Sequence, residues 1–152
     1  MRREDKEIKD KKEIESIIER ATVCRVAFSE NDVPYIVPLN FGYKDDCLYF
    51  HSAPEGKKIE IIRQNNQVCF EVDIDQEVVK SETPCNWQMK YRSVIGFGKA
   101  FFVDHPEEKR RALSIIVEHY SGDLSEYSED AINNVAIVKV EIESMTGKKS
   151  GY

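Results

Sequence analysis

Three stretches of this chain alternate apolar and polar side chains with a period of two, and that pattern limits the possible folds most. The alternation runs through residues 34–43, 67–75 and 136–142. Because an extended strand places every second side chain on the same face, each stretch is predicted to be a strand with one buried face. Three more apolar stretches bring the predicted strands to six: residues 23–28, 47–52 and 91–103.

Helices are expected between and around these strands. Residues 10–21 and 104–120 each open with the Asp-x-x-Glu spacing of a capping box and continue with apolar residues at helical spacing. The early turns are short and no strand–helix–strand rhythm appears, which disfavours a parallel sheet. The sequence therefore predicts a single domain over residues 1–152, mainly β with peripheral helices, whose six antiparallel strands form a barrel. Residues 76–90 and 121–134 are expected to be irregular.

The composition argues against several classes of function. The net charge is −6, whereas a generic nucleic-acid binder needs a basic excess to neutralise phosphates. No apolar run approaches the ~20 residues of a membrane span. Residues 1–12 are charged throughout and lack the apolar core of a secretory signal, so a cytoplasmic location is expected. The four cysteines include no Cys-x-x-Cys pair, so reduced thiols and no metal site are predicted.

The most informative candidate site is a turn that joins a strand end to a short helix. His51 and Ser52 end the strand, and Gly56, Lys57 and Lys58 precede the helix. A helix N-terminus offers unpaired N–H donors and the positive end of its dipole, and two ammonium groups add the charge that a phosphate monoester favours. The alternative interpretation is a solvated lysine pair on an exposed turn.

Two further segments contain residues suited to a flat ring. Pro38, within Val37-Pro38-Leu39-Asn40, removes a ladder donor and so marks a strand edge or bulge with uncommitted backbone groups. In the segment after residue 86, aromatic rings can stack on a ligand and a hydroxyl can hydrogen-bond it; these residues are Trp87, Tyr91 and Ser93. The alternatives are an ordinary edge strand and aromatic residues that simply cover the core.

His51 has three interpretations that the sequence leaves open. It shares a strand face with Tyr49 beside the proposed phosphate turn, where it could act as a general acid, stack on a ligand or serve a structural role. No nucleophile triad or carboxylate pair can be built from the spacing of the other reactive residues. His51 is therefore the one predicted catalytic residue.

Taken in order, five segments resemble the pyridoxamine 5′-phosphate oxidase-like FMN-binding split barrels, and within them the nitroimidazole-resistance (Nim) branch. Each segment is weak alone, but the ordered set spans most of the chain. The segments are Arg2-Arg3, Pro34-Tyr-Ile-Val-Pro-Leu-Asn-Phe-Gly-Tyr43, Leu48-Tyr-Phe-His-Ser-Ala-x-x-Gly-Lys-Lys58, Val68-Cys-Phe-Glu71 and Tyr91-Arg-Ser-Val-Ile-Gly-Phe-Gly-Lys-Ala100.

The resemblance implies an antiparallel split barrel that binds FMN at the interface of a homodimer. By that analogy Lys57, Lys58 and Ser52 hold the phosphate, while the segment 37–40 runs along the isoalloxazine. Ser93 and Trp87 would approach from the partner subunit. In the Nim branch the histidine that matches His51 is associated with the active site near the flavin.

The chain departs from the family pattern at its C-terminal end, and more than one function stays open. The chain ends at Gly147–Tyr152 without the Arg-x-His segment of true pyridoxamine phosphate oxidases, which argues against vitamin-B6 oxidation. The leading hypothesis is an FMN-dependent reductase that passes electrons from NAD(P)H to a small-molecule acceptor, such as a nitroaromatic or quinone-like compound. The competing hypotheses are a flavin-binding module without turnover and a split barrel that binds haem or a deazaflavin.

Overall fold

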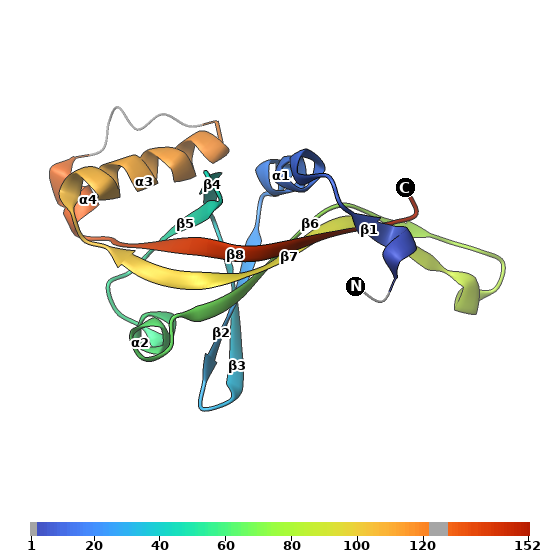
Figure 1. The fold of residues 1–152 in the computed structure, drawn as a ribbon, viewed down its shortest axis with the longest axis horizontal. Coiled ribbons are helices and arrows are strands. Elements are labelled where there is room, and N and C mark those ends of the chain that lie inside the picture. The colour runs from blue at the N-terminus through green and yellow to red at the C-terminus, as the bar shows by residue number, and fades with distance from the viewer. Residues whose placement is uncertain (1–2, 122–127) are drawn as a thin grey trace.

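Eight antiparallel strands form one strongly curved sheet in the computed structural model, which describes residues 3–121 and 128–152 (Figure 1). The strand order is β3-β2-β6-β7-β8-β5-β4, and β1 pairs with β8. The strands are β1 (Glu7–Ile8), β2 (Cys24–Glu30), β3 (Val33–Leu39), β4 (Gly42–Lys44), β5 (Cys47–Ser52), β6 (Gln67–Val79), β7 (Gln88–Val103) and β8 (Ala136–Ser150). The helices are α1 (Lys11–Arg20), α2 (Lys57–Gln64), α3 (Pro106–His119) and α4 (Glu129–Asn133), with 3₁₀ turns η1 (Glu4–Lys6) and η2 (Pro84–Asn86).

The sheet is a split barrel, because its two end strands are consecutive in sequence yet do not pair with each other. The chain passes from β3 to β4 through Asn40 and Phe41. The backbone N–H of Phe41 donates to the Tyr120 hydroxyl at 3.1 Å instead of to a neighbouring strand. Because a side chain satisfies this N–H, the backbone leaves the sheet at Phe41. The stretch 34–43, which was predicted to be one strand, therefore forms two strands, β3 and β4.

The core lies inside the curved sheet and under the helices. Four phenylalanine rings are at most 2% exposed there: Phe28, Phe41, Phe50 and Phe70. Isoleucines from α1 and α2 complete the same cluster, which explains the helical spacing of apolar residues in both segments. A smaller cluster beneath α3 contains Val103, Ala112, Leu113, Ile132 and Ile137.

The two glycines of β7 lie where the strand meets its neighbours most closely. A Cβ at Gly96 would overlap the Phe70 ring, and one at Gly98 would overlap the backbone of β8. The register between β7 and β8 shifts at Phe97/Gly98. Both glycines thus allow a close backbone approach, and the bulge contributes to the curvature of the sheet.

The mainly β split barrel with peripheral helices is confirmed, but it has eight strands where six were predicted. The additional strands are β1 and the separated β4. Residues 76–90 are not irregular throughout, because β6 continues to Val79, β7 already begins at Gln88 and the two form a hairpin. The predicted loop 121–134 contains α4, while residues 122–127 and Arg2 lie outside the described residues.

Within the described part of the chain, none of the helices combines the length and the apolar character that a membrane span requires. The helices are short and amphipathic, and they pack instead on the sheet: α1 on β6 and β7, α2 on β2, and α3 on β4 and β5.

Candidate functional site

The turn between β5 and α2 has the geometry of an anion site. Gly56 is the N-cap of α2, and its φ of +123° and ψ of 165° lie in a region that is essentially restricted to glycine. No side chain caps this helix, and a Cβ at Gly56 would meet nothing within 4 Å. The first-turn N–H groups of α2 thus begin beside open space with the positive end of the helix dipole.

Ser52 has an unusual environment for a hydroxyl group. The residue is only 7% exposed, and its Oγ is buried without a hydrogen-bond partner among the described residues. A buried polar group normally has a partner, because leaving it unpaired costs about 1–3 kcal/mol. The position of this hydroxyl at the end of β5, four residues before Gly56, makes it a candidate ligand contact.

The two lysines of the turn reach in different directions. The Lys57 ammonium lies 4.8 Å from the centroid of the Tyr35 ring, so it extends from α2 toward β3. Lys58 acts on His51 instead. His51 is exposed at the surface, but partial desolvation of its imidazole and the positive charge of Lys58 both hold its pKa below the usual value. Both effects favour the neutral imidazole, and His51 lies on the same face of β5 as Tyr49.

Residues 37–39 form the end of an edge strand, as Pro38 predicted, and Asn40 follows it. β3 lies at one end of the sheet and pairs with β2. Val37 and Leu39 are half-buried against the core, whereas Pro38 and Asn40 are exposed. The free edge of β3 therefore presents uncommitted backbone groups beside the side chain that Lys57 contacts.

Arg25 is a neighbour of this segment that sequence reasoning missed. It lies directly across from Pro38 on β2, and its guanidinium donates to Asp73 at 2.7 Å and to Glu71 at 3.1 Å. A cleft of about 340 Å³ opens beside it. The residues that line this cleft are Arg20, Thr22, Val23, Arg25, Asp73, Ile74, Asp75 and Gln76. Tyr35 belongs to the predicted strand stretch 34–43, and nothing in the sequence indicates its contact with Lys57.

The aromatic candidates of the third segment lie at the other end of the molecule (Figure 1). Trp87 is 46% exposed at the tip of the β6–β7 hairpin, and its indole N–H donates to the Ser81 carbonyl at 3.0 Å. Tyr91 is half-buried on the same hairpin, with the Lys148 ammonium 5.3 Å from its ring centroid. Ser93 is buried opposite Asp73 in the sheet. One chain does not bring these residues to the turn at Lys57 and Lys58.

A row of apolar residues crosses the outer face of the sheet. Ile36 pairs with Ala27, Ala27 with Cys69, and Cys69 with Phe97. Ile95 lies two residues from Phe97 on the same face of β7. Ile36, Phe97 and Ile95 are 61%, 52% and 42% exposed, respectively. We call Ile36, Ala27, Cys69, Phe97 and Ile95 the apolar band.

The chain is similar to a known protein family and to several proteins of known structure. The model of the family described as pyridoxamine 5′-phosphate oxidase matches residues 10–149. The structure of a candidate 5-nitroimidazole antibiotic resistance protein from Bacteroides thetaiotaomicron is similar, with 44% identity and a TM-score of 0.84 over 94% of this chain and 86% of that one. A FAD-binding protein from Mesorhizobium loti is 25% identical, with a TM-score of 0.68 over 93% of this chain and 96% of that one.

A more distant solved structure shares the fold, and a curated protein matches part of the sequence. The flavocytochrome Anf3 from Azotobacter vinelandii is 19% identical, with a TM-score of 0.84 over 100% of this chain and 72% of that one. An uncharacterized protein from Rhizobium meliloti is 29% identical over 65 residues, which are 43% of this chain and 42% of that protein. The match thus spans less than half the length of this curated relative.

Proposed function

This chain belongs to the pyridoxamine 5′-phosphate oxidase family, and we propose that it is an FMN-binding oxidoreductase that acts as a homodimer on a small-molecule electron acceptor. The single observation that carries the flavin proposal is the Ser52 hydroxyl, buried without a partner next to the uncapped N-terminus of α2. A phosphate oxygen supplies the acceptor that this donor lacks. The residues at the turn therefore fit the phosphate end of FMN.

Two lysines complete the proposed phosphate site. Lys57 and Lys58 come directly after Gly56, and the glycine-only backbone at Gly56 leaves the space above the first turn of α2 open. Charge-assisted hydrogen bonds to a phosphate are stronger than neutral ones. In this proposal Lys57, Lys58 and Ser52 bind the phosphate, and the free edge of β3 at Pro38, Leu39 and Asn40 lies along the ring.

The homodimer is proposed because the two halves of the candidate site lie far apart in one chain. The phosphate turn lies between β5 and α2, whereas Tyr91 and Ser93 are in the first half of β7 and Trp87 directly precedes that strand. Figure 1 shows the β6–β7 hairpin on the opposite side of the molecule from α2. A twofold axis that buries the apolar band would bring the far half of one copy toward the turn of the other. An exposed apolar row in the middle of a sheet is also what an interface core requires.

The chemistry would come from the cofactor, because FMN carries hydrides and electrons once it is bound and oriented. The lowered pKa of His51 favours its neutral form, and His51 is the residue proposed to act next to the ring. The cleft is lined by Arg25, which pairs with Pro38 in the sheet, and it is the proposed entry for the acceptor. A nitroaromatic acceptor, such as a 5-nitroimidazole reduced with NAD(P)H-derived electrons, is favoured by the likeness to the 44% identical protein.

The test compares FMN with riboflavin, which lacks the phosphate. Each charge-assisted contact contributes roughly 1.5–3 kcal/mol. The double variant Lys57→Ala/Lys58→Ala should therefore bind FMN about a hundredfold more weakly, since ~1.4 kcal/mol is a factor of ten. Wild type should prefer FMN strongly over riboflavin, and the variant should lose most of that preference in fluorescence titrations.

The chain offers a matched control for this experiment. Lys11 and Lys12 are also consecutive lysines in the first turn of a helix, but Asp10 caps that helix. Lys11→Ala/Lys12→Ala should bind both flavins as wild type does. Equal affinity of wild type for riboflavin and FMN would refute the phosphate site. The absorbance spectrum of the purified protein separates FMN from haem or deazaflavin, and NAD(P)H oxidation with an added acceptor separates an enzyme from a binding module.

A further inference from the structure

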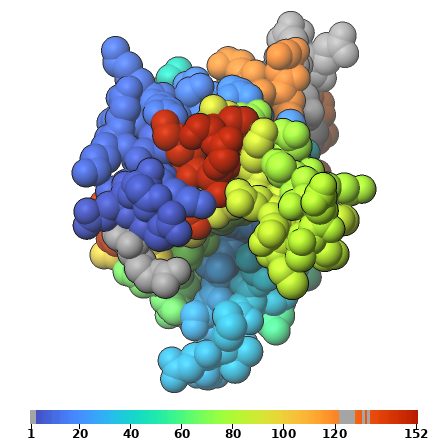
Figure 2. All heavy atoms as spheres, turned by 90° about the vertical axis from the view of Figure 1, so that its right-hand side faces the viewer, coloured from blue at the N-terminus to red at the C-terminus, as the bar shows by residue number. Residues whose placement is uncertain are grey.

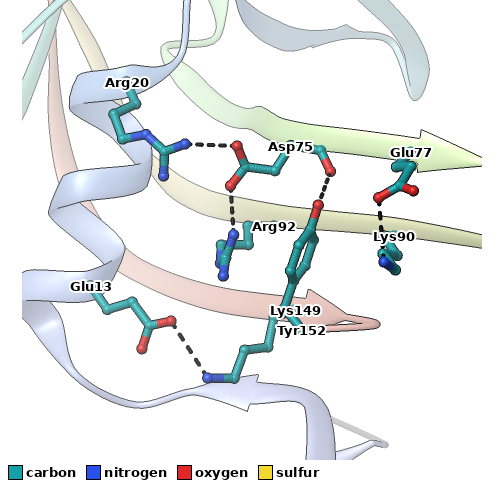
Figure 3. Close-up of polar contacts among 8 residues, drawn as sticks. All are labelled: Glu13, Arg20, Asp75, Glu77, Lys90, Arg92, Lys149 and Tyr152. Carbon is teal, nitrogen blue, oxygen red and sulfur yellow. Dashed lines mark hydrogen bonds and ion pairs between the residues drawn. The ribbon is translucent and has the colours of Figure 1, made fainter.

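Asp75 lies where the β6–β7 hairpin leaves the rest of the sheet (Figure 3). Its φ of +58° is in the left-handed region, which aspartate tolerates better than most residues. The register between β6 and β7 shifts between Ile74 and Glu77, so Asp75 is part of a bulge. A bulge bends its strand and so redirects the residues beyond it. The direction of the hairpin is therefore determined at this residue.

Four segments meet at Asp75. One carboxylate oxygen accepts from Arg20 of α1 at 2.7 Å and the other from Arg92 of β7 at 2.6 Å. Its backbone carbonyl accepts from the Tyr152 hydroxyl at 2.7 Å, and the Arg92 guanidinium lies 4.1 Å from the Tyr152 ring centroid. Burial alone would raise the pKa of Asp75, but the hydrogen bonds from Arg92 and Arg20 outweigh it and lower that pKa. We call Asp75, Arg20, Arg92 and Tyr152 the Asp75 network.

Beyond the network, the hairpin has only two strands. β8 accompanies β7 as far as the pair Tyr91–Ser150. Among the residues that the structure describes, residues 76–90, which we call the arm, therefore pair as strands only with each other. Figure 2 shows the arm in yellow-green beside the red C-terminal residues. A two-stranded ribbon alone is marginally stable in water. The orientation of the arm consequently depends on what holds its base.

The arm carries exposed apolar side chains at its far end. Val78, Trp87 and Met89 are 50%, 46% and 48% exposed. Trp87 is held locally by its hydrogen bond to Ser81 and by the Lys80 ammonium, 5.4 Å from its ring centroid. An indole that is fixed in place but left half-exposed is suited to cover a second surface.

We propose that the Asp75 network is a positioning device: it sets the angle of the arm so that Trp87 of one copy covers the flavin site of the other. The inference rests on the proposed flavin-binding homodimer and adds to it the residues that aim the arm. Asp75, Arg20, Arg92 and Tyr152 have no contact with the phosphate turn among the described residues, although Arg20 and Asp75 also line the cleft beside Arg25. Quenching of Trp87 reports their effect through the arm separately from any effect on that cleft. The four are positioning residues.

The test uses Trp87 as its own reporter, because it is the only tryptophan in the chain. Its emission overlaps flavin absorption, so a nearby flavin quenches it. FMN added to wild type should quench most of this emission. Asp75→Asn keeps a residue that tolerates the positive φ but removes the charge that holds both arginines. This variant should lose at least half of the quenching and bind FMN about tenfold more weakly, with unchanged far-UV circular dichroism.

The arm itself provides the matched control. Glu77 pairs with Lys90 at 3.3 Å one step beyond the network (Figure 3), and Glu77→Gln should quench and bind as wild type does. If Asp75→Asn fails to fold, Arg20→Gln removes the same support from the α1 side and should give the same loss of quenching. Wild-type quenching and affinity in the folded variant would overturn the proposal. FMN binding without Trp87 quenching in wild type would refute the arm alone, whereas no flavin binding would refute the proposed function.

Discussion

Ser52 is the residue at which stability and the proposed function oppose each other. A buried hydroxyl without a partner destabilises the protein that contains it, because it has given up its hydrogen bonds to water. Alanine fills nearly the same space at no such cost. A serine at this position is therefore understandable if something other than the protein supplies the missing acceptor.

The prediction for Ser52→Ala has two parts of opposite sign. Without flavin, the free energy of unfolding should stay the same or rise by about 1 kcal/mol, since an unsatisfied polar group is removed. FMN should bind roughly tenfold more weakly, because a hydrogen bond to a charged oxygen is lost. Urea unfolding with and without saturating FMN measures both, and bound FMN should make wild type the more stable protein. A large loss of stability in the flavin-free variant would show that Ser52 is structural.

At the scale of single residues, the sequence predicted only part of the proposed flavin site. The turn from His51 to Lys58 is contiguous, so its residue types and order were sufficient to predict a candidate anion site. Arg25 and Tyr35 were missed because each meets the site through a partner strand or a helix that is remote in sequence. Such neighbours depend on strand register, which the alternation pattern does not provide.

At the scale of elements, the turn before α2 depends on one residue. Gly56 adopts a φ of +123°, and space is not the obstacle to a side chain there, since a Cβ would meet nothing within 4 Å. The obstacle is the backbone conformation itself, which costs other residues about 1–3 kcal/mol. Helix α2 begins at Lys57 because glycine at the N-cap can adopt the backbone conformation that leads into the helix.

Gly56→Ala should accordingly lower the free energy of unfolding by about 1–3 kcal/mol. It should also weaken FMN binding if the turn relaxes away from the phosphate. Glu55→Ala changes an exposed neighbour in the same loop and should alter stability by less than about 0.5 kcal/mol. Chemical denaturation of the three proteins checks the prediction, and a Gly56→Ala variant as stable as wild type would contradict it.

Elements were predictable from the sequence where one face is buried. The alternation in β3, β6 and β8 reflects that burial, whereas the arm buries neither face and its sequence shows no alternation.

The N-caps of the helices were predicted less well than the strands. Asp10 caps α1 through the N–H of Lys12, as expected, but α3 has His105 as its N-cap and Pro106 as its first residue, so Asp104 does not cap it. A proline is favoured in the first turn of a helix, and here it moves the start by one residue.

At the scale of the whole molecule, the apolar band is the expected interface of the proposed homodimer. Phe97 is 52% exposed in the middle of the outer sheet face. Phe97→Glu should convert a dimer to monomers and weaken FMN binding, because a buried unpaired carboxylate is costly at an interface core. Light scattering and flavin titration measure the two effects.

Val33→Glu is the control for that experiment. Val33 is 62% exposed on the same edge strand as Ile36, but alternation places it on the opposite face of the sheet. This variant should remain a dimer with the affinity of wild type. A wild-type protein that is monomeric with FMN bound would refute the proposed assembly.

The two prolines of β3 have a consequence for the behaviour of the protein in concentrated solution. Pro34 and Pro38 are four residues apart, and a proline fits this strand where its nitrogen points away from β2. The open edge of the sheet then lacks two of the N–H donors that an added strand would need. Such an edge resists growth into fibrils while its carbonyl groups stay accessible. The prolines at the proposed ring surface thus also protect the protein from aggregation.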